Sequence, residues 1–220
     1  MGKKGLVCGV GVNDADYPTA KEGIVDGKRV TTWRCPYYTR WCAMLRRCYS
    51  KERLQAFPTY IGCSVCEEWL TFSNFRKWMA SQNWEDRHLD KDFLIEGNKV
   101  YGPDTCVFLP GQVNGFILTS KAIRGKYPLG VAYRKKSGDM VNELARPYRA
   151  IISNKAGVQI SLGAYSTPRQ AHRKFLEEKL NLLKLYIEDY KDDPLVSKGL
   201  ERIENKIQYH LDNNLELTEF

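Results

Sequence analysis

The chain has 220 residues, and Lys and Arg outnumber Asp and Glu by 34 to 26. This length exceeds the commonest domain size, so we expect two small domains rather than one. Acidic residues gather from Glu177 onward, which leaves the basic excess in the front and middle of the chain. An uneven positive charge is typical of proteins that bind nucleic acid, although charge alone does not establish that function.

Hydropathy and cysteine usage exclude two further classes. No apolar run reaches the roughly 20 residues that a membrane helix needs. The start Met1-Gly2-Lys3-Lys4 lacks the apolar region of a secretory signal. The cysteines are odd in number, so free thiols are expected rather than a disulfide framework. We therefore expect a soluble cytoplasmic protein without a membrane partner.

The first half of the chain predicts two helices and a hairpin. Residues 1–32 are rich in glycine, which favours an extended arm. Apolar spacing predicts a basic amphipathic helix from Trp33 to Tyr49 and a second helix that begins near Ser64. Two β-rich runs, 89–94 and 105–109, predict a hairpin.

The second half predicts three strands and two helices. Residues 119–127 carry cations and no acid, as expected of a basic linker. The predicted strands are Leu129 to Arg134, Tyr148 to Ser153 and Val158 to Leu162. Thr167 is the expected N-cap of the next helix, with Pro168 at its first position. The last helix begins after Asp193, and the two helices are expected to form a hairpin or a dimerising pair.

Short matches in a fixed order carry a family resemblance in the second half. They are Gly130-Val131, Tyr148 to Ile152, Ile160 to Thr167, Gln170-Ala171-His172 and Phe175. In this order they resemble the Apetala/ethylene-response DNA-binding domain. The resemblance implies a three-stranded antiparallel sheet that lies in the major groove, with an amphipathic helix packed on its back.

The sheet and the first helix supply the candidate DNA-binding residues. Side chains alternate along a strand, so one face can carry cations while the other packs on a helix. Arginine binds phosphate and pairs with guanine. The candidates are Arg46, Arg47, Lys126, Tyr133, Arg134, Lys135, Lys136, Arg146 and Arg149. The alternative is a solvated sheet face with ordinary surface cations.

The front half resembles the HNH homing endonucleases of bacteriophages, which are often fused to the same sheet module. The residues that carry the likeness are Trp41, Met44-Leu45, Arg47-Cys48-Tyr49, Tyr60, Gly62, Val65-Cys66, Glu68-Trp69, Phe72, Phe75, Leu89-Asp90-Lys91-Asp92, Gly97-Asn98-Lys99, Tyr101, Pro103, Thr105-Cys106, Phe108 and Asn114. The resemblance implies a ββα nuclease (a hydrolase) that uses a divalent metal and a general base.

The catalytic candidates are His88, Asp90, Asp92 and Asn114. Lys91 stands where the family's histidine follows the aspartate, and a protonated lysine is neither a base nor a metal ligand. On a strand, His88, Asp90 and Asp92 would share one face, where the carboxylates could hold Mg²⁺ or Mn²⁺ and His88 could be the base. The alternative is that the carboxylates form ion pairs or cap turns.

The cysteines offer a second metal hypothesis. Cys63 and Cys66 form one Cys-x-x-Cys pair, and a structural zinc needs four ligands. Cys106 with Cys48 or Cys42 would complete the set. Buried free thiols are the commoner outcome at such irregular spacing.

These patterns together predict an α+β chain: an HNH-like half, a three-stranded antiparallel sheet packed on a helix, and a C-terminal helix. The expected parts are an arm at 1–32, an HNH-like domain at 33–118, a linker at 119–127, a sheet domain at 128–191 and a helix at 192–220. The expected function is binding of double-stranded DNA, with metal-dependent phosphodiester hydrolysis. The alternative is an inactive DNA binder or an inhibitor of a host protein. A homodimer through the C-terminal helices is a further expectation, and the location is the host cytoplasm if a phage encodes the chain.

Overall fold

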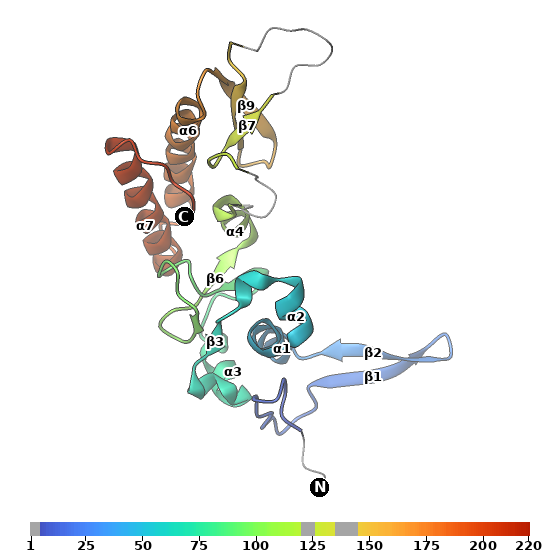
Figure 1. Cartoon of the computed structure of the whole chain (residues 1–220). Coiled ribbons are helices and arrows are strands. Elements are labelled where there is room, and N and C mark those ends of the chain that lie inside the picture. The colour runs from blue at the N-terminus through green and yellow to red at the C-terminus, as the bar shows by residue number, and fades with distance from the viewer. Residues whose placement is uncertain (1–4, 120–125, 135–144) are drawn as a thin grey trace. The chain divides into compact units, whose positions relative to one another are not determined.

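The computed structural model describes residues 5–119, 126–134 and 145–220. The chain divides into two compact units, Met1–Pro110 and Gly111–Phe220 (Figure 1). Helices and small sheets alternate in a mixed α+β chain, and a three-stranded antiparallel sheet is present as predicted. Among the described residues, no helix is long and apolar enough to cross a membrane.

The first unit consists of short strands and helices. Its elements are β1 (Ala20–Val25), β2 (Lys28–Arg34), α1 (Pro36–Tyr49), α2 (Lys51–Ala56), η1 (Pro58–Tyr60), β3 (Ser64–Val65), η2 (Glu67–Leu70), α3 (Phe72–Ala80), β4 (Arg87–Asp90), β5 (Val100–Tyr101) and β6 (Val107–Pro110). The pairs β1–β2 and β4–β6 are antiparallel, and β3–β5 is parallel.

An aromatic cluster forms the core of this unit. Trp41 on α1 packs against Phe72 on α3, with 5.5 Å between their ring centroids. The Trp41 indole nitrogen donates a hydrogen bond of 2.7 Å to the carbonyl of Trp69. The predicted apolar face of α1 is confirmed, since Trp41, Leu45 and Cys48 are buried. This core fixes α1 and α3 against the β4 segment through shared buried residues such as Leu89 and Phe108.

The expected extended arm at residues 1–32 is corrected by the structure. Strands β1 and β2 form a hairpin, because Asp26 and Gly27 adopt the positive φ values of 51° and 73° that a tight two-residue turn needs. Upstream, Val7 and Tyr17 pack against the core. The first helix therefore begins at Pro36 rather than Trp33, since residues up to Arg34 are paired in β2.

Two other predicted elements of the first unit have different bounds. The second helix begins at Phe72 and not near Ser64, because Ser64 and Val65 pair with β5 and Glu67–Leu70 form a 3₁₀ turn. The strand predicted at 89–94 ends at Asp90. The antiparallel pairing of the two β-rich runs is confirmed by the register of β4 with β6.

The second unit is a sheet packed on a helix pair. Its elements are α4 (Gly111–Ile117), β7 (Val131–Tyr133), β8 (Tyr148–Ser153), β9 (Gln159–Tyr165), α6 (Pro168–Asp189) and α7 (Pro194–Asp212). The sheet order is β7-β8-β9, and α6 contacts the sheet on one side and α7 on another (Figure 1).

Local signals decide where α6 begins. The Thr167 hydroxyl accepts the Gln170 N–H and the Gln170 side chain accepts the Thr167 N–H, a capping box that confirms the predicted start at Pro168. Helix α6 then packs closely on the sheet at Gly130. A Cβ atom at this position would lie only 2.0 Å from the ring of Phe175 on α6. Helix α7 buries the predicted stripe of Val196, Leu200, Ile203, Ile207 and Leu211.

The division between the units falls after Pro110, whereas the sequence placed the end of the HNH-like domain at residue 118. Helix α7 packs on α6 within the second unit and is not a separate part. The core of the expected linker, residues 120–125, lies outside the described residues.

Candidate nucleic-acid interface

Strand β4 carries two of the predicted catalytic residues. His88 is exposed and pairs with Leu109 of β6, while Asp90 is half-buried at the last position of the strand. Asp92 lies beyond the strand. The shared face expected for three side chains therefore extends only from His88 to Asp90.

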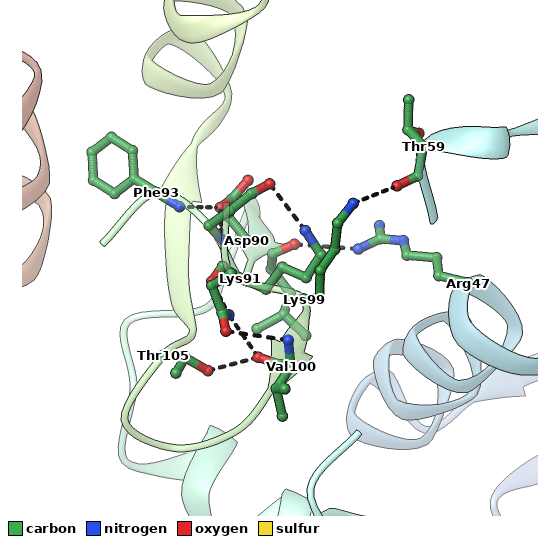
Figure 2. A network of polar contacts seen from close by, with 11 residues as sticks. Arg47, Thr59, Asp90, Lys91, Phe93, Lys99, Val100 and Thr105 are labelled. Carbon is green, nitrogen blue, oxygen red and sulfur yellow. Dashed lines mark hydrogen bonds and ion pairs between the residues drawn. The ribbon is translucent and has the colours of Figure 1, made fainter. Parts of the chain in front are cut away.

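The Asp90 carboxylate closes the turn after β4. Its Oδ1 accepts the N–H groups of Asp92 at 2.9 Å and Phe93 at 2.8 Å, as Figure 2 shows for Phe93. Burial and the neighbouring Asp92 carboxylate raise the pKa of Asp90 to about 6. Asp90 thus has the turn-capping role that the sequence left as the alternative.

Lys91 is buried, with only 6% of its surface exposed, and its ammonium donates a 2.9 Å hydrogen bond to Asp92 Oδ2 (Figure 2). Burial lowers the pKa of Lys91, but the hydrogen bond and the charge of Asp92 raise it by more, so the pKa lies above its usual value. The positively charged Lys91 side chain therefore lies beside the carboxylates of Asp92 and Asp90.

Asn98 holds the loop that follows. Its amide Nδ2 donates to the carbonyls of Lys91 at 2.6 Å and Val100 at 2.8 Å, and its Oδ1 accepts the Val100 N–H. Thr105 Oγ1 donates to the same Val100 carbonyl at 2.8 Å (Figure 2). The sequence placed Asn98 only among the residues that carry the HNH resemblance, because its contact with Lys91 depends on the course of the loop.

These contacts test whether a divalent cation fits. Asp90 Oδ1 already accepts two hydrogen bonds, and Asp92 is neutralised by Lys91. Within residues 5–119, 126–134 and 145–220, no cluster of three or more His, Cys, Asp or Glu side chains is arranged to hold a metal. Asp90 Oδ1 and the charge of Asp92 are thus already used within the chain, and a metal at Asp90 and Asp92 stays a prediction. Asn114 is half-buried on α4 in the second unit.

The cysteines are thiols without disulfides. Burial raises the pKa of the Cys48 thiol to about 12, with a smaller contribution from the nearby Cys63. Burial likewise raises the pKa of Cys106 to about 12, with Cys66 among its neighbours. The two cysteines of the Cys-x-x-Cys pair therefore lie near different partners, and zinc also stays a prediction.

The outer face of the β7–β8–β9 sheet is open and cationic. Val131 and Ala150 are buried toward α6, so the alternate residues face away from the helix. Arg149 is exposed between Ala132 and Ala164 on the neighbouring strands. Arg134 follows β7, and its N–H bonds the Pro147 carbonyl, which makes it a diagonal neighbour of Arg149 on the same face.

Charge on this region is one-sided. Residues 126–134 and 145–167 contain Lys126, Arg134, Arg146, Arg149 and Lys155 and no Asp or Glu. Lys155 pairs with Asp189 of α6. Among the residues that the structure describes, the other four cations form no ion pair, and all four are exposed. Their charge is available to an anionic ligand.

Tyr133 differs from the arginines. It has the strand parity of Val131 and so lies on the helix side of the sheet, with 44% of its surface exposed. Its ring lies 5.7 Å from that of Tyr127 and 5.4 Å from that of Tyr148. Tyr133 therefore lies on the face of the sheet opposite Arg149, and its contact with DNA stays a prediction.

The two arginines predicted on α1 have different surroundings. Arg46 is exposed. Arg47 is half-buried, donates a 3.2 Å hydrogen bond to the Leu89 carbonyl (Figure 2) and lies 5.8 Å from the Tyr60 ring. Arg46 is thus free to meet a ligand, while Arg47 holds β4 against α1. Lys135 and Lys136 lie outside the described residues.

Two features therefore bear on function: the open cationic face of the sheet and the internally bonded segment after β4. Both features are described from this chain alone. Comparisons with the models of known protein families, with curated proteins and with solved structures find no match.

Proposed function

We propose that the chain binds duplex DNA through the outer face of β7–β8–β9, as a protein of the phage HNH-endonuclease type with an Apetala-type sheet. The observation that carries the proposal is Arg149. It is exposed, forms no ion pair with a described residue, and has alanines on both neighbouring strands. The opposite face packs on α6, so the sheet has one face for the core and one for a ligand.

The dimensions and chemistry of such a face suit DNA. The major groove admits a β surface, and small side chains beside an arginine allow its guanidinium to approach a base edge. Arg134 and Arg146 add charge that phosphates neutralise. Residues 126–134 and 145–167 contain no Asp or Glu, so these segments themselves offer no negative charge that would repel a polyanion.

The test is the affinity of the protein for a fluorescent 30-base-pair duplex, measured by anisotropy. Arg149→Ala should weaken binding about tenfold, in the range of a lost arginine contact. Lys184→Ala is the matched control, since it removes one exposed cation from α6. Equal affinities of the two variants would contradict the proposal, and so would absence of binding by the wild-type protein.

Metal-dependent hydrolysis of DNA is the second candidate. One observation favours it: the Asp92 N–H donates to Asp90 Oδ1 at 2.9 Å, so these two acidic residues lie close together, and His88 is exposed two residues before Asp90 on the same strand. The Lys91 ammonium and the capping role of Asp90 weigh against it. We therefore propose binding without cleavage.

Supercoiled plasmid incubated with the protein in Mg²⁺, in Mn²⁺ and in EDTA separates the two candidates. Binding without cleavage predicts intact plasmid that is retarded on a gel. Nicking that needs metal and is lost in Asp90→Asn would overturn it, because the asparagine keeps an oxygen for the two backbone N–H groups and removes only the charge.

A further inference from the structure

The β1–β2 hairpin is a second open surface. All residues of both strands are exposed apart from the half-buried Gly23. Within the first unit, Figure 1 shows the hairpin extending away from α1 and α3. Large apolar side chains are exposed along it, among them Val25 with 51% of its surface accessible. A ribbon with both faces open and exposed apolar groups is suited to contact another molecule.

The register separates two faces of different chemistry. Lys21 pairs with Trp33, Gly23 with Val30 and Val25 with Lys28, and a bulge after Lys21 keeps Trp33 on this side. The Lys21 ammonium lies 5.6 Å from the Trp33 ring. This first face carries apolar groups between a cation at each end and contains no acid.

The second face carries Glu22, the acidic residue of the two strands. Glu22 lies opposite Thr31, and its carboxylate is 3.6 Å from Arg29. Arg34 at the base donates to Thr31 Oγ1 at 3.4 Å. Because Glu22 is on this side and already paired, the first face presents unopposed positive charge.

We propose that the first face of the β1–β2 hairpin lies in the major groove of duplex DNA, with Lys21 and Lys28 on phosphates and Val30 and Trp33 toward the bases. The groove is about 12 Å wide and admits a two-stranded ribbon. Lys28 lies opposite Val25, four residues along from Lys21, so the two lysines are about 14 Å apart along the ribbon and can reach separate phosphates. Apolar side chains contact thymine methyl groups there.

Charge decides the occupant. The hairpin carries Lys21, Lys28, Arg29 and Arg34 against Glu22 and Asp26, and the acid-free face is suited to a polyanion. A protein that adds a strand to the hairpin edge, or a second copy of the chain, would gain little from two lysines beside the apolar groups. This inference rests on the proposed DNA binding and assigns a second contact to it.

The test compares double variants of equal charge in the full-length protein. Lys21→Ala/Lys28→Ala alters the first face, and Arg29→Ala/Arg34→Ala alters the second. We expect the first to weaken duplex binding about tenfold and to lower the slope of log Kd against log salt concentration by about two. The second should change affinity less than about threefold. Circular dichroism should be unchanged in both, since these side chains are exposed.

Protection of guanine N7 from dimethyl sulfate reports the groove, because N7 lies in the major groove. The wild type should protect guanines that Lys21→Ala/Lys28→Ala leaves reactive. If that variant binds like the wild type while Arg149→Ala binds weakly, the hairpin inference fails and the sheet proposal stands. If the wild type does not bind duplex DNA, both fail. A change in molecular mass on a sizing column without a change in DNA affinity would assign the hairpin to a second copy and overturn the inference.

Discussion

The two units differ in how far their charged side chains are bonded within the fold. Around β4 in the first unit, Asp90 caps a turn, Lys91 pairs with Asp92, and Arg47 holds a backbone carbonyl. In the second unit, Arg149 is exposed without a carboxylate, and Lys179 is buried without one among the described residues. A charged side chain is available to a ligand only where the fold does not already use it.

The pKa values of two buried lysines, one in each unit, shift in opposite directions. Lys91 and Lys179 are each 6% exposed. Lys91 has the Asp92 carboxylate, and its pKa is raised. Lys179 donates to the Phe116 carbonyl between the rings of Phe116 and Phe220, and burial lowers its pKa to about 7. Burial lowers the pKa of both lysines, and the Asp92 carboxylate, which Lys179 lacks an equivalent of among the described residues, raises that of Lys91.

The largest effect is expected at Lys179. Its folded pKa lies below the unfolded value of 10.5, so the unfolded chain binds the proton more tightly and stability is lost as pH falls from about 10 toward 7. Lys179→Met should therefore raise the free energy of unfolding at pH 7 by on the order of 3 kcal/mol, with a smaller gain at pH 9.5. Urea unfolding at both pH values measures this. A variant less stable than the wild type at pH 7 would show that the carbonyl and ring contacts outweigh burial.

A smaller effect is expected at Asp90. Asp90→Ala leaves two backbone N–H groups without their acceptor and should destabilise the protein by about 2 kcal/mol. Asp90→Asn keeps the acceptor oxygen and should stay within about 1 kcal/mol of the wild type. Urea unfolding at pH 7 compares them. Equal losses in both variants would mean that the charge, and not the cap, is what the fold needs.

The smallest effect is expected at the neighbouring arginines of α1. Arg46→Ala should weaken DNA binding by less than about threefold and leave stability unchanged, as for an exposed phosphate contact. Arg47→Ala should lower the free energy of unfolding by about 1 kcal/mol, because it removes the hydrogen bond to Leu89. Anisotropy and urea unfolding are the two measurements. A larger loss of DNA affinity for Arg46→Ala would extend the interface to α1.

Sequence reasoning was most successful in the second unit, where local signals are strong. The strand Tyr148–Ser153 and the cap Thr167-Pro168 were predicted to the residue, because turn and cap residues determine them locally. In the first unit the hairpin was missed, although Asp26-Gly27 directly after Ile24-Val25 is a recognised hairpin signal. The parallel pairing of β3 with β5 joins two-residue strands far apart in the chain and leaves no periodicity to detect.

The candidate site divides in the same way. Alternation along a strand led to the expectation that one face of the sheet can carry cations, and in the structure Arg149 is exposed while its neighbour Ala150 is buried. It failed for Asp92, because the Asp90 carboxylate bonds to the backbone of Asp92 and Phe93 and ends the strand. Whether a carboxylate serves a ligand or its own loop depends on such contacts, which residue types and spacing do not determine.

The most direct test of the central claim is the salt dependence of duplex binding by the wild type and by Arg134→Ala/Arg149→Ala. Each lost phosphate contact lowers the slope of log Kd against log salt by about 0.9. The account predicts a steep slope for the wild type, reduced by about one in the double variant, because Arg134 is assigned to a phosphate and Arg149 to a base edge. An equal slope for both proteins, or binding by the wild type that does not depend on salt, would contradict the assignment of the sheet as the DNA-binding face.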